Sequence, residues 1–78
     1  MITPRQIRAA RALLNWSQQQ LADKAIISLN ALARLEKGLV DSRVSTVLAV
    51  QKALAKAGIE FLEADQKGEG VRLKSPKA

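Results

Sequence analysis

Residues 17–38 read SQQQLADKAIISLNALARLEKG, and this stretch decides the fold of the chain. It divides into two short helical segments that meet at a tight corner. A run of glutamines opens the first segment. In the second, Asn30 and Arg34 are four residues apart and share one face, whereas Leu32 and Leu35 lie on the other. A helix pair of this kind can place its second helix in the major groove of duplex DNA.

Capping residues set the bounds of both segments. Ser17 and Gln20 have the spacing of a capping box, which predicts a helix over about residues 18–25. Ser28 is a further N-cap and predicts the second helix over about 29–37. Gly38 then supplies the left-handed stop.

Helices are also expected on both sides of this pair. Thr3, Pro4 and Gln6 combine a cap, a proline at the first helical position and a capping box, which predicts a helix over about 4–14. Its inward residues recur at helical spacing and are Ile7, Ala10, Leu13 and Leu14. After a loop at 39–44, Ser45 is expected to cap a long helix that ends at Ala57, before Gly58.

The period changes after Gly58. Residues 59–63 and 70–74 alternate as strands do, and the turn-rich stretch between them predicts a β-hairpin. An isolated hairpin is only marginally stable in water, so this one is expected to pack against another part of the protein or a second subunit. Its apolar side chains are expected either to contact a second subunit or to pack on the preceding helix; they are Ile59, Phe61, Val71 and Leu73. Residues 75–78 are expected to form a flexible tail.

Composition excludes several classes of function. The 78 residues suffice for one small domain, and they contain neither cysteine nor histidine, which removes disulfides and the usual thiolate and imidazole metal sites. No nucleophile and base stand in a catalytic pattern, so we expect neither an enzyme nor a cofactor. Without a long apolar run or a signal peptide, a soluble cytoplasmic protein is expected.

The positive charge is concentrated in the helical part. The net charge at pH 7 is +6, and residues 1–58 hold nine Lys and Arg against three acidic residues, whereas residues 59–78 hold four of each. A basic field favours polyanions such as nucleic acid. Solubility alone would be the plain explanation of such a charge.

These residues resemble the signature of the Xre/Cro/phage-repressor-like helix-turn-helix regulators. The resemblance covers about residues 4–58 and rests on Gln18-x-x-Leu21-Ala22, then Ser28, then Leu32-x-x-Leu35-Glu36-x-Gly38. It implies an all-α domain of four to five helices, similar to that of lambda repressor, over residues 1–58. The segment at 59–74 also resembles a small C-terminal β-hairpin that follows this domain in some bacterial members.

The resemblance also implies roles for single residues. Gln18 matches a glutamine that contacts a DNA phosphate, and Leu29, Asn30 and Arg34 match the groove-facing positions. Their chemistry fits: Arg34 can donate two bonds to guanine, Asn30 can bracket adenine, and Leu29 can touch a thymine methyl.

Three further side chains are candidates for phosphate contacts, and two are expected to be structural. Lys37 and Arg43 flank the recognition helix, and the Ser28 hydroxyl can meet a phosphate as well as cap the helix. In the family an arginine of the first helix pairs with the glutamate that ends the third, and Arg11 and Glu36 match these positions.

Ile26 departs from the family pattern, which has glycine at this corner. A β-branched residue at positive φ is strained, so either the corner has another geometry or the strain is tolerated.

The expected function is sequence-specific binding of duplex DNA by a homodimeric transcriptional regulator. The apolar Ile26 and Leu29 also fit an alternative, an antitoxin or anti-activator that acts mainly on a protein partner.

Overall fold

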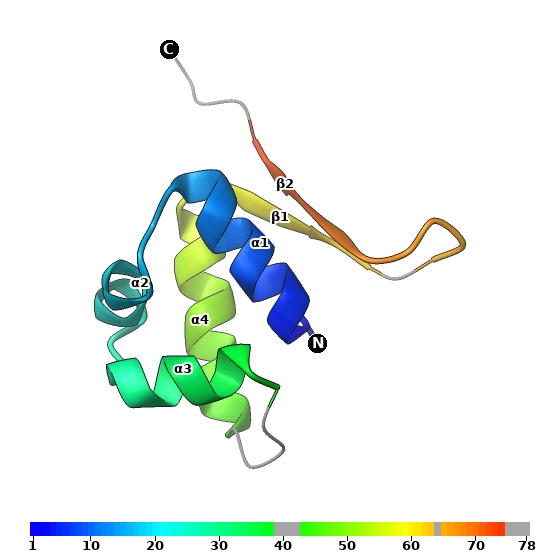
Figure 1. Cartoon of the computed structure of the whole chain (residues 1–78). Coiled ribbons are helices and arrows are strands. Elements are labelled where there is room, and N and C mark those ends of the chain that lie inside the picture. The colour runs from blue at the N-terminus through cyan, green and yellow to red at the C-terminus, as the bar shows by residue number, and fades with distance from the viewer. Residues whose placement is uncertain (39–42, 64, 75–78) are drawn as a thin grey trace.

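The computed structural model of the chain describes residues 1–38, 43–63 and 65–74. Within these ranges the chain forms four helices and a two-stranded antiparallel hairpin (Figure 1), so the predicted fold class is confirmed. The elements are α1 (Pro4–Leu14), α2 (Gln18–Ala25), α3 (Leu29–Glu36), α4 (Val44–Lys56), β1 (Ile59–Leu62) and β2 (Gly70–Leu73). The tail predicted for 75–78 and most of the loop predicted for 39–44 lie outside the described residues.

The predicted caps form at three of the four helices. Thr3 and Ser17 close capping boxes with Gln6 and Gln20, and the Ser28 hydroxyl accepts a bond from the Ala31 N–H. These bonds satisfy N–H groups that the first turn of a helix leaves without partners.

The start of α4 was predicted wrongly. Its N-cap is Arg43, which makes no side-chain capping bond, and Ser45 lies inside the first turn. The backbone of Arg43 is extended, and its carbonyl already accepts from the N–H groups of Thr46 and Val47. The N-cap of α4 therefore lies two residues before Ser45, the predicted cap.

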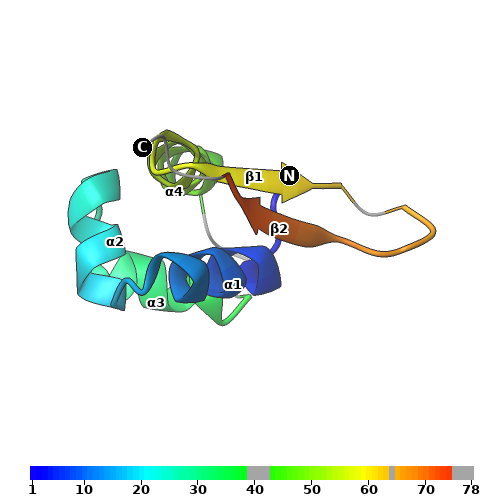
Figure 2. The ribbon, with the colours of Figure 1, turned by 90° about the horizontal axis from the view of Figure 1, so that it is seen from above.

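The elements surround one hydrophobic core. Seen from above, α1 and α3 lie on one side, α4 and β1 on the other, and α2 closes one end (Figure 2). The fully buried large side chains are Ile7, Leu21, Leu32, Val50 and Leu54. Leu13 was expected to face inward, but it is 46% exposed, because Ile7, Ala10 and Leu14 already span the inward side of α1.

The hairpin packs within the chain. Ile59 belongs to the core at 2% exposure, and Phe61 and Val71, which pair across the strands, pack against that core. β1 contacts α4 and β2 contacts α1. Of the four residues considered for a dimer contact, only Leu73 is exposed, at 38%.

Polar bonds fasten the hairpin to the start of α1. The buried Gln6 amide donates to the Leu62 carbonyl at 3.0 Å and to the Gly70 carbonyl at 2.9 Å, so one side chain holds both strands. The Glu69 carboxylate accepts from the Thr3 hydroxyl at 2.6 Å and from the Arg5 guanidinium at 3.0 Å. Gln6 therefore both caps α1 and orients the hairpin.

Among the described residues, no helix has both the length and the apolar character needed to cross a membrane.

Stability at low pH should depend on Glu69. The bonds donated by Arg5 and then by Thr3 hold the pKa of this carboxyl below its ordinary value. The carboxylate therefore stabilises the folded chain above about pH 4.3, the value for unperturbed glutamate, and this contribution disappears as the pH falls through the lower folded-state pKa. In urea unfolding between pH 7 and pH 3, Glu69→Gln should lose less stability than the wild type. Equal losses would contradict this role, and Glu60→Gln in the same hairpin is the control.

Candidate nucleic-acid interface

Helix α3 has one buried and one exposed face. Leu32 and Leu35 are 0% and 5% exposed and lie in the core, whereas Asn30 and Arg34 are exposed on the opposite side. Leu29, the first residue of the helix, is 41% exposed. Packing thus leaves all three predicted base-reading side chains on the surface of one short helix.

A buried ion pair fixes the end of α3. The Arg11 guanidinium of α1 donates through Nε and Nη2 to the two oxygens of Glu36, each at 2.9 Å. The Glu36 side chain is only 4% exposed and that of Arg11 is 23% exposed. A carboxylate this deeply buried is stable only with well-placed donors, and the bidentate geometry provides them.

Further donors surround this pair. The Gln18 amide donates to Glu36 Oε1 at 3.2 Å, and Arg11 Nη1 donates to the Trp16 carbonyl at 3.1 Å. Arg8 donates to the backbone carbonyl of Glu36, at the C-terminal end of α3. Residues from α1 and α2 therefore hold the end of α3, and we call Arg8, Arg11, Gln18 and Glu36 the α3 anchor.

The role of Arg8 was not anticipated from the sequence, although a signal existed. Arg8 and Arg11 are three residues apart and so project from the same side of α1. Arg11 was expected to pair with Glu36, so Arg8 on the same side of α1 could be expected to reach the same end of α3. A cation there also meets the negative end of the helix dipole.

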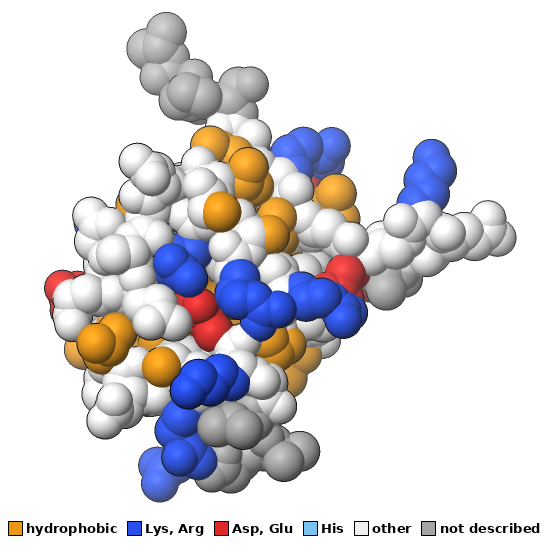
Figure 3. Space-filling model, in the orientation of Figure 1, with side chains coloured by type: hydrophobic (Ala, Val, Ile, Leu, Met, Phe, Trp, Pro, Cys, Tyr) orange, Lys and Arg blue, Asp and Glu red, His pale blue; other side chains and the backbone are white. Residues whose placement is uncertain are grey.

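The candidate phosphate contacts lie at the ends of helices. Gln18 begins α2 and is half-buried against Glu36, while the exposed Ser28 is the N-cap of α3. Lys37 is the C-cap of α3 and Arg43 is the N-cap of α4; both are exposed. Lys and Arg side chains gather over α1 and α3 on the face shown in Figure 3.

Ile26 adopts the strained conformation. Its φ and ψ are 57° and 50°, in the left-handed region, and its side chain is 89% exposed. The corner keeps this geometry because the Ile27 N–H donates to the Ala22 carbonyl at 3.0 Å, a bond that closes the end of α2. Since the side chain buries almost nothing, no packing within the described residues offsets the strain.

Replacing one partner of the ion pair should be costly. Among the described residues, Arg11→Met leaves the buried Glu36 carboxylate with Gln18 as its remaining side-chain donor, so the free energy of urea unfolding should fall by about 3 kcal/mol. The control is Arg72→Met, which breaks the exposed pair with Glu60 and should cost less than about 1 kcal/mol. Equal costs for the two variants would argue against the anchor.

Relieving the corner should stabilise the fold. Ile26→Asn introduces a residue that tolerates the left-handed region, and it should raise the free energy of unfolding by about 1 kcal/mol. Ile27→Asn is the matched control, because Ile27 is partly buried against the core and its replacement should destabilise. A destabilised Ile26→Asn protein would show that the corner is not strained.

The family model for helix-turn-helix domains, HTH_3, matches residues 7–61, which include α1 from its fourth residue onward, the whole of α2, α3 and α4, and most of β1. None of the curated proteins matches the chain.

Proposed function

Because the chain belongs to the Xre/Cro/lambda-repressor-like helix-turn-helix family, a family of DNA-binding regulatory domains, we propose that it binds specific sequences in duplex DNA and regulates transcription. The observation that carries the proposal is the exposed face of α3, with Asn30 and Arg34 on a helix whose end is held by the α3 anchor. A reading helix must be held rigidly, since base contacts fail when donors shift by an ångström or so.

Each of three side chains of α3 contacts a different base. Arg34 donates two bonds to guanine O6 and N7, and Asn30 brackets adenine N6 and N7. Leu29 makes apolar contact with a thymine methyl at the start of the helix. Each bidentate pair discriminates against the wrong base by about 1–3 kcal/mol.

Contacts to the DNA phosphates position the helix on the duplex. Lys37 and Arg43 neutralise phosphates on either side of the segment that follows α3, and Gln18 and Ser28 meet phosphates at helix N-termini. Gln18 is suited to this task because its amide is oriented by Glu36. These contacts supply affinity that depends on salt and carries no sequence information.

A single reading helix covers only a few base pairs, so the proposal includes a homodimer on two half-sites about 34 Å apart, one turn of DNA. We place such a regulator in the cytoplasm of a bacterial cell, as a bacterial or phage-type protein, where the duplex is accessible to it.

The alternative is a module of the antitoxin or anti-activator type that acts mainly on a protein partner. The observation that favours it is the pair of exposed apolar side chains at the corner, Ile26 at 89% and Leu29 at 41%. Mobility shifts with the DNA upstream of the gene at low salt separate the two functions. Absence of any shift would reject the regulator and favour the protein partner.

Two substitutions test the division between reading and positioning. Arg34→Ala should weaken binding to the preferred site by about 1–3 kcal/mol and relax specificity at one position. Lys37→Ala should weaken specific and random DNA alike and lower the slope of log affinity against log salt by about one. Titrations at several salt concentrations measure both. If the two variants affected specific and random DNA equally, Arg34 would lose its base-reading role.

A further inference from the structure

We infer that a second copy of this chain docks on the side of α4, on a surface that we call the α4 patch. It consists of Met1, Ile2, Val44, Leu48, Gln51, and the β1 side chain Phe61. The inference rests on the proposed function, because reading two half-sites requires a dimer. It adds the surface through which the two subunits meet.

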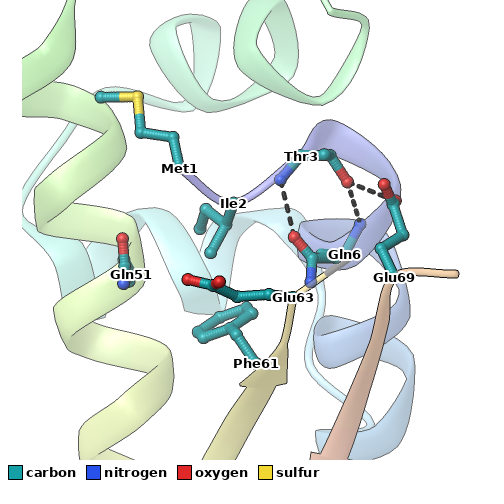
Figure 4. Close-up of a pocket in the computed structure, with 8 residues that line it drawn as sticks. All are labelled: Met1, Ile2, Thr3, Gln6, Gln51, Phe61, Glu63 and Glu69. Carbon is teal, nitrogen blue, oxygen red and sulfur yellow. Dashed lines mark hydrogen bonds between the residues drawn. The ribbon is translucent and has the colours of Figure 1, made fainter. Parts of the chain in front are cut away.

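Exposed apolar side chains are grouped on this side of α4. Val44 is 59% exposed and Leu48 is 52% exposed, and their spacing of four puts them on one helix face. Gln51 continues that face and borders a pocket of about 410 Å³ that Met1, 76% exposed, also lines. Figure 4 shows the Met1 side chain extending toward α4. Apolar surface gathered in this way marks an interaction site.

The pocket adds depth and a charge to the patch. Ile2 and Phe61 form its apolar part, and the Glu63 carboxylate points from the end of β1 toward Gln51 (Figure 4). Lys52 follows Gln51 on α4 and is exposed. Within the described part of the chain, neither Glu63 nor Lys52 belongs to an ion pair.

This combination suits a second copy of the chain. A two-fold interface uses the same surface on both subunits, so that surface must be complementary to itself. The α4 patch has an apolar centre between one anion and one cation, which lets Lys52 of each subunit meet the partner's Glu63 around a Leu48–Leu48 contact. The charged side chains over α1 and α3 are instead mostly Lys and Arg, and they would repel the same face of a second copy (Figure 3).

The position of the patch also suits two half-sites. At 100° per residue, Val44, Leu48 and Gln51 lie about a quarter-turn from the core-facing Val47, Val50 and Leu54. Ala53, on the opposite flank of α4, borders the groove beside Trp16 of the α1–α2 corner. The patch therefore faces sideways, and a two-fold axis beside it that runs parallel to α4 leaves both α3 helices, which cross near the N-terminal end of α4, on the same side of the dimer (Figure 1).

The mass of the full chain in solution tests the interface. By light scattering or sedimentation, the wild type should have twice the 8.5 kDa mass of one chain at micromolar concentration. Leu48→Glu should weaken the dimer by at least about 30-fold and give the single-chain mass, while circular dichroism remains helical. The matched controls, Leu13→Glu on α1 and Leu73→Glu on the hairpin, should remain dimeric.

A charge exchange provides a second, independent readout. Lys52→Glu and Glu63→Lys should each weaken the dimer, and the double variant should restore it. The inference is overturned by a wild type of 8.5 kDa, by a Leu48→Glu protein that stays dimeric, or by a double variant no tighter than the single ones. A dimeric wild type that binds no DNA would reject the proposed function and leave the interface standing. A monomeric wild type that binds half-sites would do the reverse.

Discussion

The bidentate ion pair between Arg11 and Glu36 is the interaction on which the rest of the structure depends. Glu36 ends α3 and is almost fully buried, so its charge must be matched inside the domain. Arg11 matches it from α1 and Gln18 from the start of α2, and the same network fixes where α3 ends relative to both helices. The leucines on the other face of α3 lie in the core. Together with these bonds, this packing sets the orientation of the exposed face of α3.

Helix α1 joins the two ends of the molecule. Its first turn carries Gln6, which bonds both strands of the hairpin, and its later turns carry Arg8 and Arg11, which bond the end of α3. The hairpin and α3 are thus bonded to opposite ends of α1. Under the proposed function, this arrangement assigns DNA binding to the basic side chains over α1 and α3 and dimerisation to the α4 patch.

The sequence predicted most of the fold, because capping boxes and glycine stops are local signals. The bounds of α1 and α2 were predicted to the residue, and the Ser28 cap and the Gly38 stop located α3 to within one residue at its end. Ser45 misled because a serine near a helix start resembles a cap whether or not its backbone is extended. The bonds that Gln6 and Glu69 make to hairpin and helix join residues more than fifty positions apart, and no local pattern announces them. Exposure is equally non-local, which is why Ile59 could be considered for a dimer contact although it lies in the core.

Selection of preferred sites from a random duplex library tests the central claim most directly, namely that the anchored face of α3 reads DNA. Wild-type protein should enrich a two-fold symmetric site whose half-sites are about 10 base pairs apart, centre to centre, with guanine and adenine at positions that Arg34 and Asn30 reach. The Arg34→Ala protein should lose the guanine preference and keep the spacing. Recovery of random sequence by the folded wild type would contradict the account.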